Sequence, residues 1–328
     1  MESSATQFSV RPLVSIMIIT YNQKDFVRET VLSAVNQDYQ TLEVIVSDDG
    51  SADGTAEILD ELAREYPARL KVISRQGNLG ITGNSNRGLK ACNGDLIAFQ
   101  GGDDVLLPGK ISSQVRWFGE SDDRVYCYHD VEVFDSETNT KICNYNDMIP
   151  LISGSGASQV IRRMKLGAST SVMIRRSAIA GHIFDPRLPV VSDWKLWIDV
   201  LAGGGEYGFV DGVYARYRRH GGNSRLTQSE QYRTDCYVTV ALVESEYPQY
   251  CRDTRIAHAR VTAVHALHEA FEGRHANAWK LWLNSARNAW LSVKYPLGII
   301  FSMLPLHMQR FLVRHLRYLV PELAYAQY

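Results

Sequence analysis

The sequence has few of the features that mark secreted, membrane-spanning or nucleic-acid-binding proteins. Its 328 residues include five scattered cysteines, no two of which form a CxxC pair. Neither a zinc knuckle nor a disulfide framework is therefore indicated, and a reducing cytoplasm fits best. No apolar run reaches the roughly 18 residues that span a bilayer. The formal net charge of -1 gives no electrostatic reason to expect nucleic-acid binding.

Two common nucleotide-binding motifs are also missing. The chain has no GxxxxGK[ST] loop and no GxGxxG after its first predicted strand. ATP hydrolysis and nicotinamide binding in their usual forms are therefore disfavoured. Residues 1–11 are polar and lack the apolar core of a secretory signal, so we expect a flexible tail there.

Residues 13–104 alternate between strand-like and helix-like patterns. Strands are predicted at 14–19, 42–46, 70–74 and 96–99, and helices over 25–36, 54–66 and up to Cys92. This alternation predicts a doubly wound, mostly parallel sheet with helices on both faces. Ligands of such sheets bind at the carboxyl ends of the strands. We therefore expect four polar segments to converge on one edge: 20–22, 47–51, 77–86 and 100–104.

The rest of the chain is less regular and then becomes helical. We predict a strand at 125–134, a loop at 136–148, a short strand at 171–174 and a helix at 191–202. From about Gln228 the pattern is helical. The segments 256–272 and 277–293 predict a helical hairpin, with Gly273 placed to cap its first helix.

The segment Gln100-Gly101-Gly102-Asp103-Asp104 is the most informative of the polar tips. It presents two carboxylates at the end of an apolar strand. Hard oxygen ligands of this kind suit Mg²⁺ or Mn²⁺, which usually also hold substrate phosphates. The structural alternative is a polar turn before a helix that begins near Pro108.

Five separated motifs resemble those of glycosyltransferase family 2. They are VSIMIITYN at 14–22, VIVSDDGSADGT at 44–55, NLGITGNSNRG at 78–88, LIAFQGGDD at 96–104 and SDWKLW at 192–197. The resemblance covers roughly residues 12–225. It implies the GT-A fold (a Rossmann-like sheet flanked by helices) and inverting transfer of a sugar from a nucleotide.

The resemblance also implies roles for particular residues. For the nucleotide it implies Thr20, Tyr21, Asn22, Asp49, Asn78, Gly80, Asn86 and Asp103. For the metal ion it implies Asp103, with Asp104 beside it and His220 on a mobile loop; for the diphosphate, Arg218 and Arg219. Asp193 matches the catalytic base and Trp194 packs behind it, while Ser169 and Thr170 are weaker candidates for contact with acceptor or sugar.

The chemistry of inverting transfer agrees with these roles. The acceptor hydroxyl loses a proton as it attacks, and the Asp193 carboxylate can take it. A divalent ion on Asp103 would neutralise charge on the leaving diphosphate. Structural readings remain open: Asp193 as a helix N-cap, Asp48 and Asp49 as turn formers, His220 as a loop residue, and Arg218 and Arg219 as a solvated basic face.

The sequence departs from the family pattern at three positions. Gly101 replaces the first carboxylate of the usual Asp-x-Asp, which is expected to weaken the Mg²⁺ or Mn²⁺ site. Ser85 stands where the family often has an arginine near the base, and we expect the neighbouring Arg87 to face elsewhere on its helix. Ser192 replaces the glutamate before the base. The QxxRW motif of processive synthases is absent, which favours addition of a single sugar.

The C-terminal region is unusually apolar and then basic. Trp279, Trp282, Trp290 and 295–306 precede a segment, 310–319, in which arginines alternate with aromatic and aliphatic residues. One interpretation is peripheral attachment to the cytoplasmic face of the inner membrane. The alternatives are a helical subdomain packed on the catalytic domain and a homodimer interface.

The sequence thus predicts a tail at 1–11, a GT-A domain at 12–226 and a helical region at 227–328. The predicted activity uses a nucleoside-diphosphate sugar, UDP- or dTDP-linked, and a glycan or lipid-linked saccharide acceptor in surface polysaccharide or lipopolysaccharide synthesis. One alternative is a catalytically weak sugar-nucleotide-binding or scaffold protein with a degraded metal site. Another, a sugar-phosphate nucleotidyltransferase, lacks that class's glycine-rich basic loop after the first strand.

Overall fold

The computed structural model describes residues 11–73, 77–147, 149–164, 166–179, 181–223, 227–288 and 308. The chain divides into two compact units. The first comprises Met1–Asn146, Leu151–Ala157 and Leu166–Gln228, and the second comprises Asp147–Pro150, Ser158–Lys165 and Ser229–Tyr328. Each unit is described separately.

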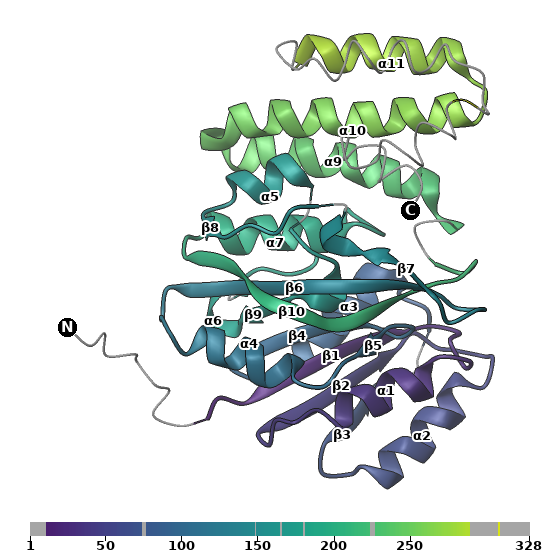
Figure 1. The fold of residues 1–328 in the computed structure, drawn as a ribbon, viewed down its shortest axis with the longest axis vertical. Coiled ribbons are helices and arrows are strands. Elements are labelled where there is room, and N and C mark those ends of the chain that lie inside the picture. The colour runs from purple at the N-terminus through teal and green to yellow at the C-terminus, as the bar shows by residue number, and fades with distance from the viewer. Residues whose placement is uncertain are drawn as a thin grey trace. The chain divides into compact units, whose positions relative to one another are not determined.

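The first unit is built on four parallel strands in the order β3-β2-β1-β4 (Figure 1). Their bounds are β1 Val14–Thr20, β2 Leu42–Asp48, β3 Leu70–Ile73 and β4 Leu96–Gly101. The connecting helices are α1 Val27–Val35, α2 Thr55–Glu65 and α3 Gly80–Ala91. The parallel sheet with connecting helices that the alternating pattern predicts is confirmed for this part of the chain.

Strand β1 is at the centre because its side chains are apolar on both faces. Val14, Ile16 and Ile18 are fully buried on one face, and Met17 is 3% exposed on the other. A parallel strand covered by helices on both sides has this pattern. Helix α3 approaches closely at Gly88, where a Cβ atom would lie 3.1 Å from the Met17 side chain.

Beyond β4 the sheet becomes mixed. Strand β9 (Met173–Arg175) pairs antiparallel with both β4 and β6 (Arg124–Asp135). Strand β10 (Glu206–Arg219) then runs parallel to β6, and β5 (Val105–Leu106) pairs antiparallel with β10. Two short strands pair at the margins, β7 (Lys141–Asn144) with β6 and β8 (Gly154–Ser155) with β10.

Three loop predictions were wrong. The predicted loop at 136–148 contains β7 and the 3₁₀ turn η1 (Tyr145–Asp147), and most of the predicted loop at 77–86 is the first half of α3. The segment at 217–219, expected in a mobile loop, is the end of β10. Register shifts between Val210 and Ala215 interrupt the alternation of β10, so its period of two is hidden in the sequence.

The remaining helices of the first unit are α4 (Lys110–Phe118), α6 (Arg176–Ile179) and α7 (Ser192–Ala202), together with the 3₁₀ turn η2 (Ser169–Ser171). Helix α7 matches the prediction at 191–202 and contributes Trp197 to the core, where it is 2% exposed. The Trp197 ring lies edge-on to Phe99 of β4, with 4.9 Å between ring centroids.

The second unit is helical. It contains α5 (Ser158–Arg163), α9 (Ser229–Glu246), the 3₁₀ turn η3 (Pro248–Tyr250), α10 (Cys251–Phe271) and α11 (His275–Asn288). Gly273 adopts a positive φ of 77° between α10 and α11, as its predicted capping position requires. The Ser285 hydroxyl of α11 donates to the Ala259 carbonyl of α10 at 2.6 Å, so the predicted hairpin is present through Asn288.

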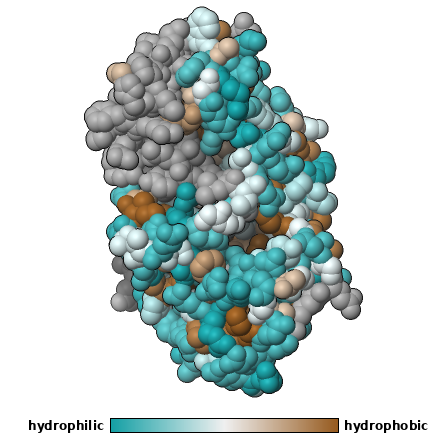
Figure 2. Space-filling model, turned by 90° about the vertical axis from the view of Figure 1, so that its right-hand side faces the viewer, coloured by the Kyte–Doolittle hydropathy of each residue, from teal (hydrophilic) through white to brown (hydrophobic). Residues whose placement is uncertain are grey.

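The apolar surface of the described residues is dispersed. On the face in Figure 2, hydrophilic residues predominate and the hydrophobic ones form small separate clusters. On α11, Trp279 and Leu283 are 47% and 45% exposed. None of the helices within the described ranges has the length and hydropathy needed to cross a bilayer. The predictions for Trp290, 295–306 and 310–319 lie outside the described residues.

Candidate functional site

The carboxyl ends of β1, β2 and β4 meet at one edge of the sheet, as predicted. Thr20 at the end of β1 pairs with Asp48 of β2, and Ile19 pairs with Gly101 of β4. The Asp49 amide continues this pairing with a hydrogen bond to the Thr20 carbonyl at 3.0 Å. The polar segments that follow these strands therefore share one site.

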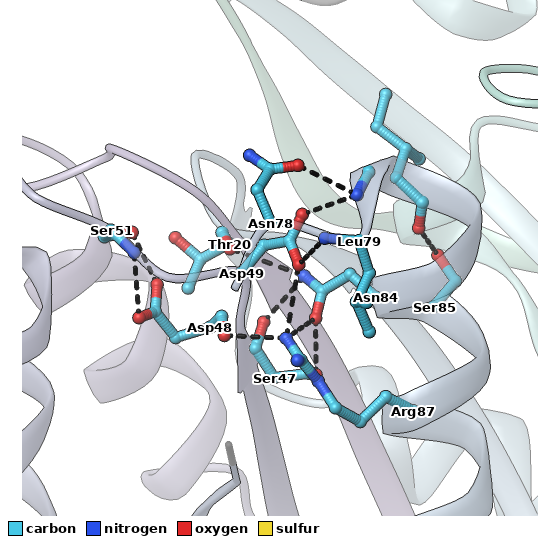
Figure 3. Close-up of polar contacts among 12 residues, drawn as sticks. Thr20, Ser47, Asp48, Asp49, Ser51, Asn78, Leu79, Asn84, Ser85 and Arg87 are labelled. Carbon is cyan, nitrogen blue, oxygen red and sulfur yellow. Dashed lines mark hydrogen bonds and ion pairs between the residues drawn. The ribbon is translucent and has the colours of Figure 1, made fainter. Parts of the chain in front are cut away.

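Asp49 lies against the N-terminus of α3 (Figure 3). Its two carboxylate oxygens accept hydrogen bonds from the amides of Leu79 and Gly80 at 2.8 and 2.9 Å. The positive end of the helix dipole stabilises a carboxylate in this position. Asp49 is 3% exposed, so this residue caps α3 from the neighbouring strand end. The alternative of Asp49 as a turn former was therefore wrong, since its side chain binds α3 and not its own turn, and contact with a nucleotide base stays a prediction.

Arg87 corrects the expectation that it faces away from the site. Its Nη2 donates to the Asp48 carbonyl and to Asn84 Oδ1, both at 2.7 Å, and lies 3.4 Å from Asp49 Oδ1. Its Nε donates to Ser47 Oγ at 3.1 Å. Arg87 is one turn after Asn84 on α3, so both side chains point toward the end of β2 (Figure 3). Arg87 therefore places a positive charge beside Asp49, close to where Ser85 stands in place of the arginine of the family motif.

In the Thr20–Asn22 segment Thr20 is buried, while Tyr21 and Asn22 are exposed. Thr20 is buried and donates to Gln23 Oε1 at 2.8 Å. Asn22, with a φ of 51°, accepts a hydrogen bond from the Ala52 amide at 2.9 Å and is tied to the loop after β2. Tyr21 is 47% exposed, so its ring is available to a ligand at this edge.

Two of the predicted nucleotide residues, Asn78 and Gly80, lie at the start of α3 at this edge of the sheet. Asn78 Oδ1 accepts from the Gly80 amide at 2.9 Å, and Gly80 has a φ of 73°. Asn86 instead donates to the Phe184 carbonyl at 2.7 Å and accepts from the Phe184 amide at 2.9 Å. Both hydrogen-bonding ends of the Asn86 side chain are thus used to hold a segment 98 residues away in the sequence, so its predicted nucleotide contact is not supported.

The metal prediction is best met by Asp103 and His220. His220 Nε2 lies 2.8 Å from Asp103 Oδ2, and Asn223 Nδ2 donates to the same oxygen at 3.3 Å. A carboxylate and an imidazole suit a divalent ion that takes its other ligands from substrate phosphates. The described residues include no group of three or more His, Cys, Asp or Glu side chains arranged for a metal ion. Metal binding by Asp103 and His220 therefore stays a prediction.

Asp104 is not placed as an auxiliary ligand. It is 3% exposed, and its Oδ1 accepts from the Arg218 amide at 3.0 Å. Burial raises the pKa of the Asp104 carboxyl well above its usual range, and the charge of Asp103 raises that pKa further. Asp104 therefore fixes the end of β10 to the turn after β4.

Arg218 differs from the prediction because it lies near the end of a strand with its side chain buried, whereas the diphosphate contact of Arg219, the last residue of β10, stays a prediction. The Arg218 guanidinium donates to the Asp103 carbonyl at 2.7 Å and to Glu29 Oε2 at 2.5 Å. It lies between the rings of Phe26 and Phe134, at 4.8 and 4.7 Å from their centroids. With a side chain only 8% exposed, Arg218 is neither a solvated basic residue nor a mobile diphosphate ligand.

Asp193 is the second residue of α7 and not its N-cap. Its Oδ2 accepts from Ser169 Oγ at 2.6 Å, and its Oδ1 accepts from the Trp194 amide at 2.7 Å. The structure thus brings the predicted base and one weak acceptor candidate into contact. Trp194 is 2% exposed and packs in the core. Thr170 is also 2% exposed, and its buried hydroxyl has no hydrogen-bond partner among the described residues.

Several functional-site residues were missed by the sequence analysis. Phe26 packs against His220 with 4.7 Å between ring centroids, and Asn223 accepts the His220 amide at 2.8 Å. Asn223 could have been found from the spacing His220-x-x-Asn223, because an asparagine side chain at this spacing can close a turn by accepting a hydrogen bond from the His220 amide. No local signal marked Phe26.

Known proteins resemble this chain in sequence and in fold. The family model described as glycosyl transferase family 2 matches residues 15–179. A curated Escherichia coli relative, UDP-Glc:α-D-GlcNAc-diphosphoundecaprenol β-1,3-glucosyltransferase WfaP, is 30% identical over 213 residues, covering 64% of this chain and 79% of that protein.

Two solved structures are similar in fold. Residues 1–349 of Staphylococcus aureus TarS, in complex with UDP-GlcNAc, match with a TM-score of 0.62 and 16% identity, covering 96% of this chain and 92% of that one. The Pyrobaculum calidifontis mannosyltransferase PcManGT, in complex with GDP-Man and Mn²⁺, matches with a TM-score of 0.62 and 15% identity, covering 99% and 89%.

Proposed function

This chain belongs to glycosyltransferase family 2, and from that premise we propose that it transfers one sugar, with inversion, from a nucleoside-diphosphate sugar to an acceptor hydroxyl. The observation that carries the proposal is the pairing of two carboxylate sites across one turn. Ser169 of η2 contacts Asp193, and Val172, which directly follows η2, accepts a hydrogen bond from the Phe99 amide of β4, the strand that leads into Asp103. A base and a metal-type pair on either side of a turn suit a single displacement.

Asp193 is proposed as the general base. Each of its oxygens accepts one hydrogen bond from the protein, which leaves further lone pairs for the acceptor hydroxyl. Transfer of that proton to Asp193 as the hydroxyl attacks the anomeric carbon would contribute roughly 10²–10⁴-fold to the rate.

Asp103 and His220 are proposed to hold a divalent ion at the diphosphate. When bound, Mg²⁺ or Mn²⁺ would offset the negative charge that develops on the leaving nucleoside diphosphate. Arg218 supports this pair indirectly, because its guanidinium fixes the Asp103 carbonyl. Tyr21, exposed directly after the end of β1, is proposed to contact the nucleotide.

The substrates are proposed by chemistry and by analogy. TarS and PcManGT were solved with UDP-GlcNAc and GDP-Man, which supports a nucleotide-sugar donor; we propose a UDP- or dTDP-sugar. WfaP is named for a diphosphoundecaprenol-linked acceptor, which supports a lipid-linked saccharide acceptor in surface polysaccharide or lipopolysaccharide synthesis. We propose that residues 12–226 form the transferase domain. We also propose that residues 227–328 bring it to the cytoplasmic face of the inner membrane or form a homodimer.

A scan of nucleotide sugars tests the proposed activity. Release of nucleoside diphosphate is measured with Mn²⁺, with Mg²⁺ and with EDTA, and the anomeric configuration of the product is read by NMR. We expect release with a subset of donors, inversion, and a drop of ~10²–10⁴-fold in the variant Asp193→Asn. Wild-type turnover in that variant would remove Asp193 as the base. Flotation of the full chain with anionic and neutral liposomes tests membrane attachment separately.

One observation favours a second candidate, a sugar-nucleotide-binding protein of weak activity. Gly101 replaces the first carboxylate of the family triplet. In that case calorimetry would detect binding of UDP-sugars, while no donor and acceptor combination would release UDP above the level of the Asp193→Asn variant.

A further inference from the structure

The turn before β9 makes a contact that the proposed mechanism does not require. Ser169 opens η2, and its hydroxyl donates to Asp193 Oδ2 at 2.6 Å. We propose that Ser169 is the positioning residue for the base, which sets the orientation of the Asp193 carboxylate toward the acceptor. This inference rests on the proposed function.

The carboxylate is held at both ends. Ser169 binds Oδ2, while the Trp194 amide binds Oδ1 at 2.7 Å. The Trp194 amide adjoins Asp193 and moves with it along α7. The Ser169 hydroxyl is therefore the contact that fixes the plane of the carboxylate relative to the rest of the sheet. A base must be held within a fraction of an ångström and 10–20° of its productive geometry to act efficiently.

The turn that carries Ser169 is rigidly anchored. The Ala168 carbonyl accepts from the Ser171 amide at 2.8 Å and from the Ser171 hydroxyl at 2.6 Å, which closes the turn. The next residue, Val172, accepts from the Phe99 amide of β4 at 3.1 Å. Because β4 also leads into the Asp103 tip, the turn relates the orientation of the base to the strand that carries the metal-type pair.

The start of α7 is anchored on its other side by Ser192. Its hydroxyl lies 2.8 Å from the Thr82 hydroxyl of α3, and Thr82 donates to the Leu188 carbonyl at 2.5 Å. Ser192 is 2% exposed, so its side chain packs against α3 and is not available to orient the Asp193 carboxylate. Among the described residues, the contact that reaches the Asp193 carboxylate from outside α7 therefore comes from Ser169.

Loss of the Ser169 hydroxyl should affect catalysis more than binding. Asp193 would keep its place on α7 but lose the hydrogen bond that fixes its orientation. A hydrogen bond to a charged group corresponds to a rate change of about 10- to 100-fold. We therefore expect Ser169→Ala to lower kcat by about that factor, with unchanged affinity for UDP and Mn²⁺.

The experiment compares Ser169→Ala and Ser169→Thr with a matched control, Ser112→Ala. Ser112 of α4 also donates to a carboxylate, Asp38 Oδ2, at 2.7 Å, but on the exposed surface. Turnover is followed as nucleotide release with Mn²⁺ from UDP-glucose, or from whichever scanned nucleotide sugar turns over fastest. UDP affinity is measured by calorimetry and folding by thermal unfolding.

The expected result is a lower kcat for Ser169→Ala, recovery in Ser169→Thr, and wild-type behaviour in Ser112→Ala. Wild-type kcat in Ser169→Ala would overturn the inference. Equal losses of kcat, UDP affinity and melting temperature in both Ser169 variants would overturn it too, because they would indicate a purely structural residue. The variant Asp193→Asn separates the two proposals. If it turns over normally the proposed base fails, whereas if it is inactive while Ser169→Ala is not, only the role of Ser169 fails.

Discussion

Asp103 and His220 lie side by side, with 2.8 Å between Oδ2 and Nε2, although 117 residues separate them in the sequence. One follows β4 and the other follows β10. Asn223 ties the two together, because it donates to Asp103 Oδ2 at 3.3 Å and accepts the His220 amide at 2.8 Å. The Asn223 side chain therefore helps to hold the pair together.

This arrangement predicts that His220 contributes to metal-dependent nucleotide binding. We expect His220→Ala to weaken the affinity for UDP in the presence of Mn²⁺ by about 10- to 100-fold, the range for changes in or next to a metal shell. Affinity measured by calorimetry with EDTA should differ little between variant and wild type. His275→Ala, which alters an exposed histidine at the start of α11, is the control. Equal affinity of His220→Ala and wild type with Mn²⁺ would contradict the assignment.

Placing an aspartate at Gly101, where the family triplet has its first carboxylate, should not improve the metal site. A Cβ atom at Gly101 would lie 2.9 Å from Asp103 Oδ1 and 3.4 Å from Asp104 Oδ2. Gly101→Asp must therefore displace Asp103, and we expect Mn²⁺ affinity to fall by about 10-fold or more, with a lower melting temperature. Gly203→Ala, where a Cβ atom meets ordinary contacts, is the control. Tighter Mn²⁺ binding in Gly101→Asp would show that the turn can rearrange.

Arg87 is predicted to organise the nucleotide edge through Asp49. Arg87→Met removes donors to Ser47, Asp48 and Asn84 and leaves the Asp49 carboxylate without its cation. We expect UDP affinity to fall by about 10-fold, and Arg87→Lys to recover only part of it, because an ammonium group cannot reproduce the planar fork. Calorimetric titration with UDP measures the effect. Undiminished affinity in Arg87→Met would separate this network from nucleotide binding.

Asn86 is predicted to act on stability and not on nucleotide binding. Asn86→Ala leaves the Phe184 amide and carbonyl without their partners. The expected loss is about 2 kcal/mol of unfolding free energy, measured by urea denaturation. UDP affinity of the folded variant should equal that of wild type. A selective loss of UDP affinity at normal stability would instead support the nucleotide role first predicted for Asn86.

Lys110 predicts a pH dependence of stability. The side chain is fully buried and donates to Gln114 Oε1 at 2.8 Å, and burial lowers the pKa of Lys110 from 10.5 to about 7. Between these values the unfolded chain holds a proton that the folded chain lacks. The free energy of unfolding therefore rises with pH from about 7 to 10.5 and is lowest below pH 7.

Replacing Lys110 should remove this dependence. We expect Lys110→Met to be more stable than wild type at pH 6 by on the order of 1–4 kcal/mol, less what is lost when Gln114 gives up its donor. Urea denaturation from pH 6 to 10 measures how the free energy of unfolding changes with pH in wild type and in Lys110→Met. The control is Lys71→Met, which alters an exposed lysine of β3. Parallel slopes for wild type and Lys110→Met would refute the assignment.

Local patterns were sufficient for the parallel half of the sheet. The continuous apolar runs that became β1, β2 and β4 can be stable only when covered on both faces, and their polar ends must then meet at one edge. The resemblance to family motifs singled out Asp103, His220 and Asp193 before their contacts were known.

The roles of Arg87, Asn86 and Ser169 could not be predicted from local patterns. The contacts of Arg87 depend on how α3 is rotated about its axis relative to β2. A shift of one residue along the helix would turn the side chain away from the end of β2. Asn86 and Ser169 depend on partners 98 and 24 residues away. Strand β10 was missed because its register shifts disguise the alternation of a strand.

The sequence by itself determined the fold class, the sheet edge and the identity of the candidate carboxylates, because burial periodicity and motif order are local properties. Only the tertiary structure decided what each carboxylate contacts. Asp49 caps α3, Asp104 is buried against β10, Asp103 meets His220, and Asp193 is held by Ser169. The function of a carboxylate depends on the hydrogen-bond donors around it, and here folding brings those donors from distant parts of the chain.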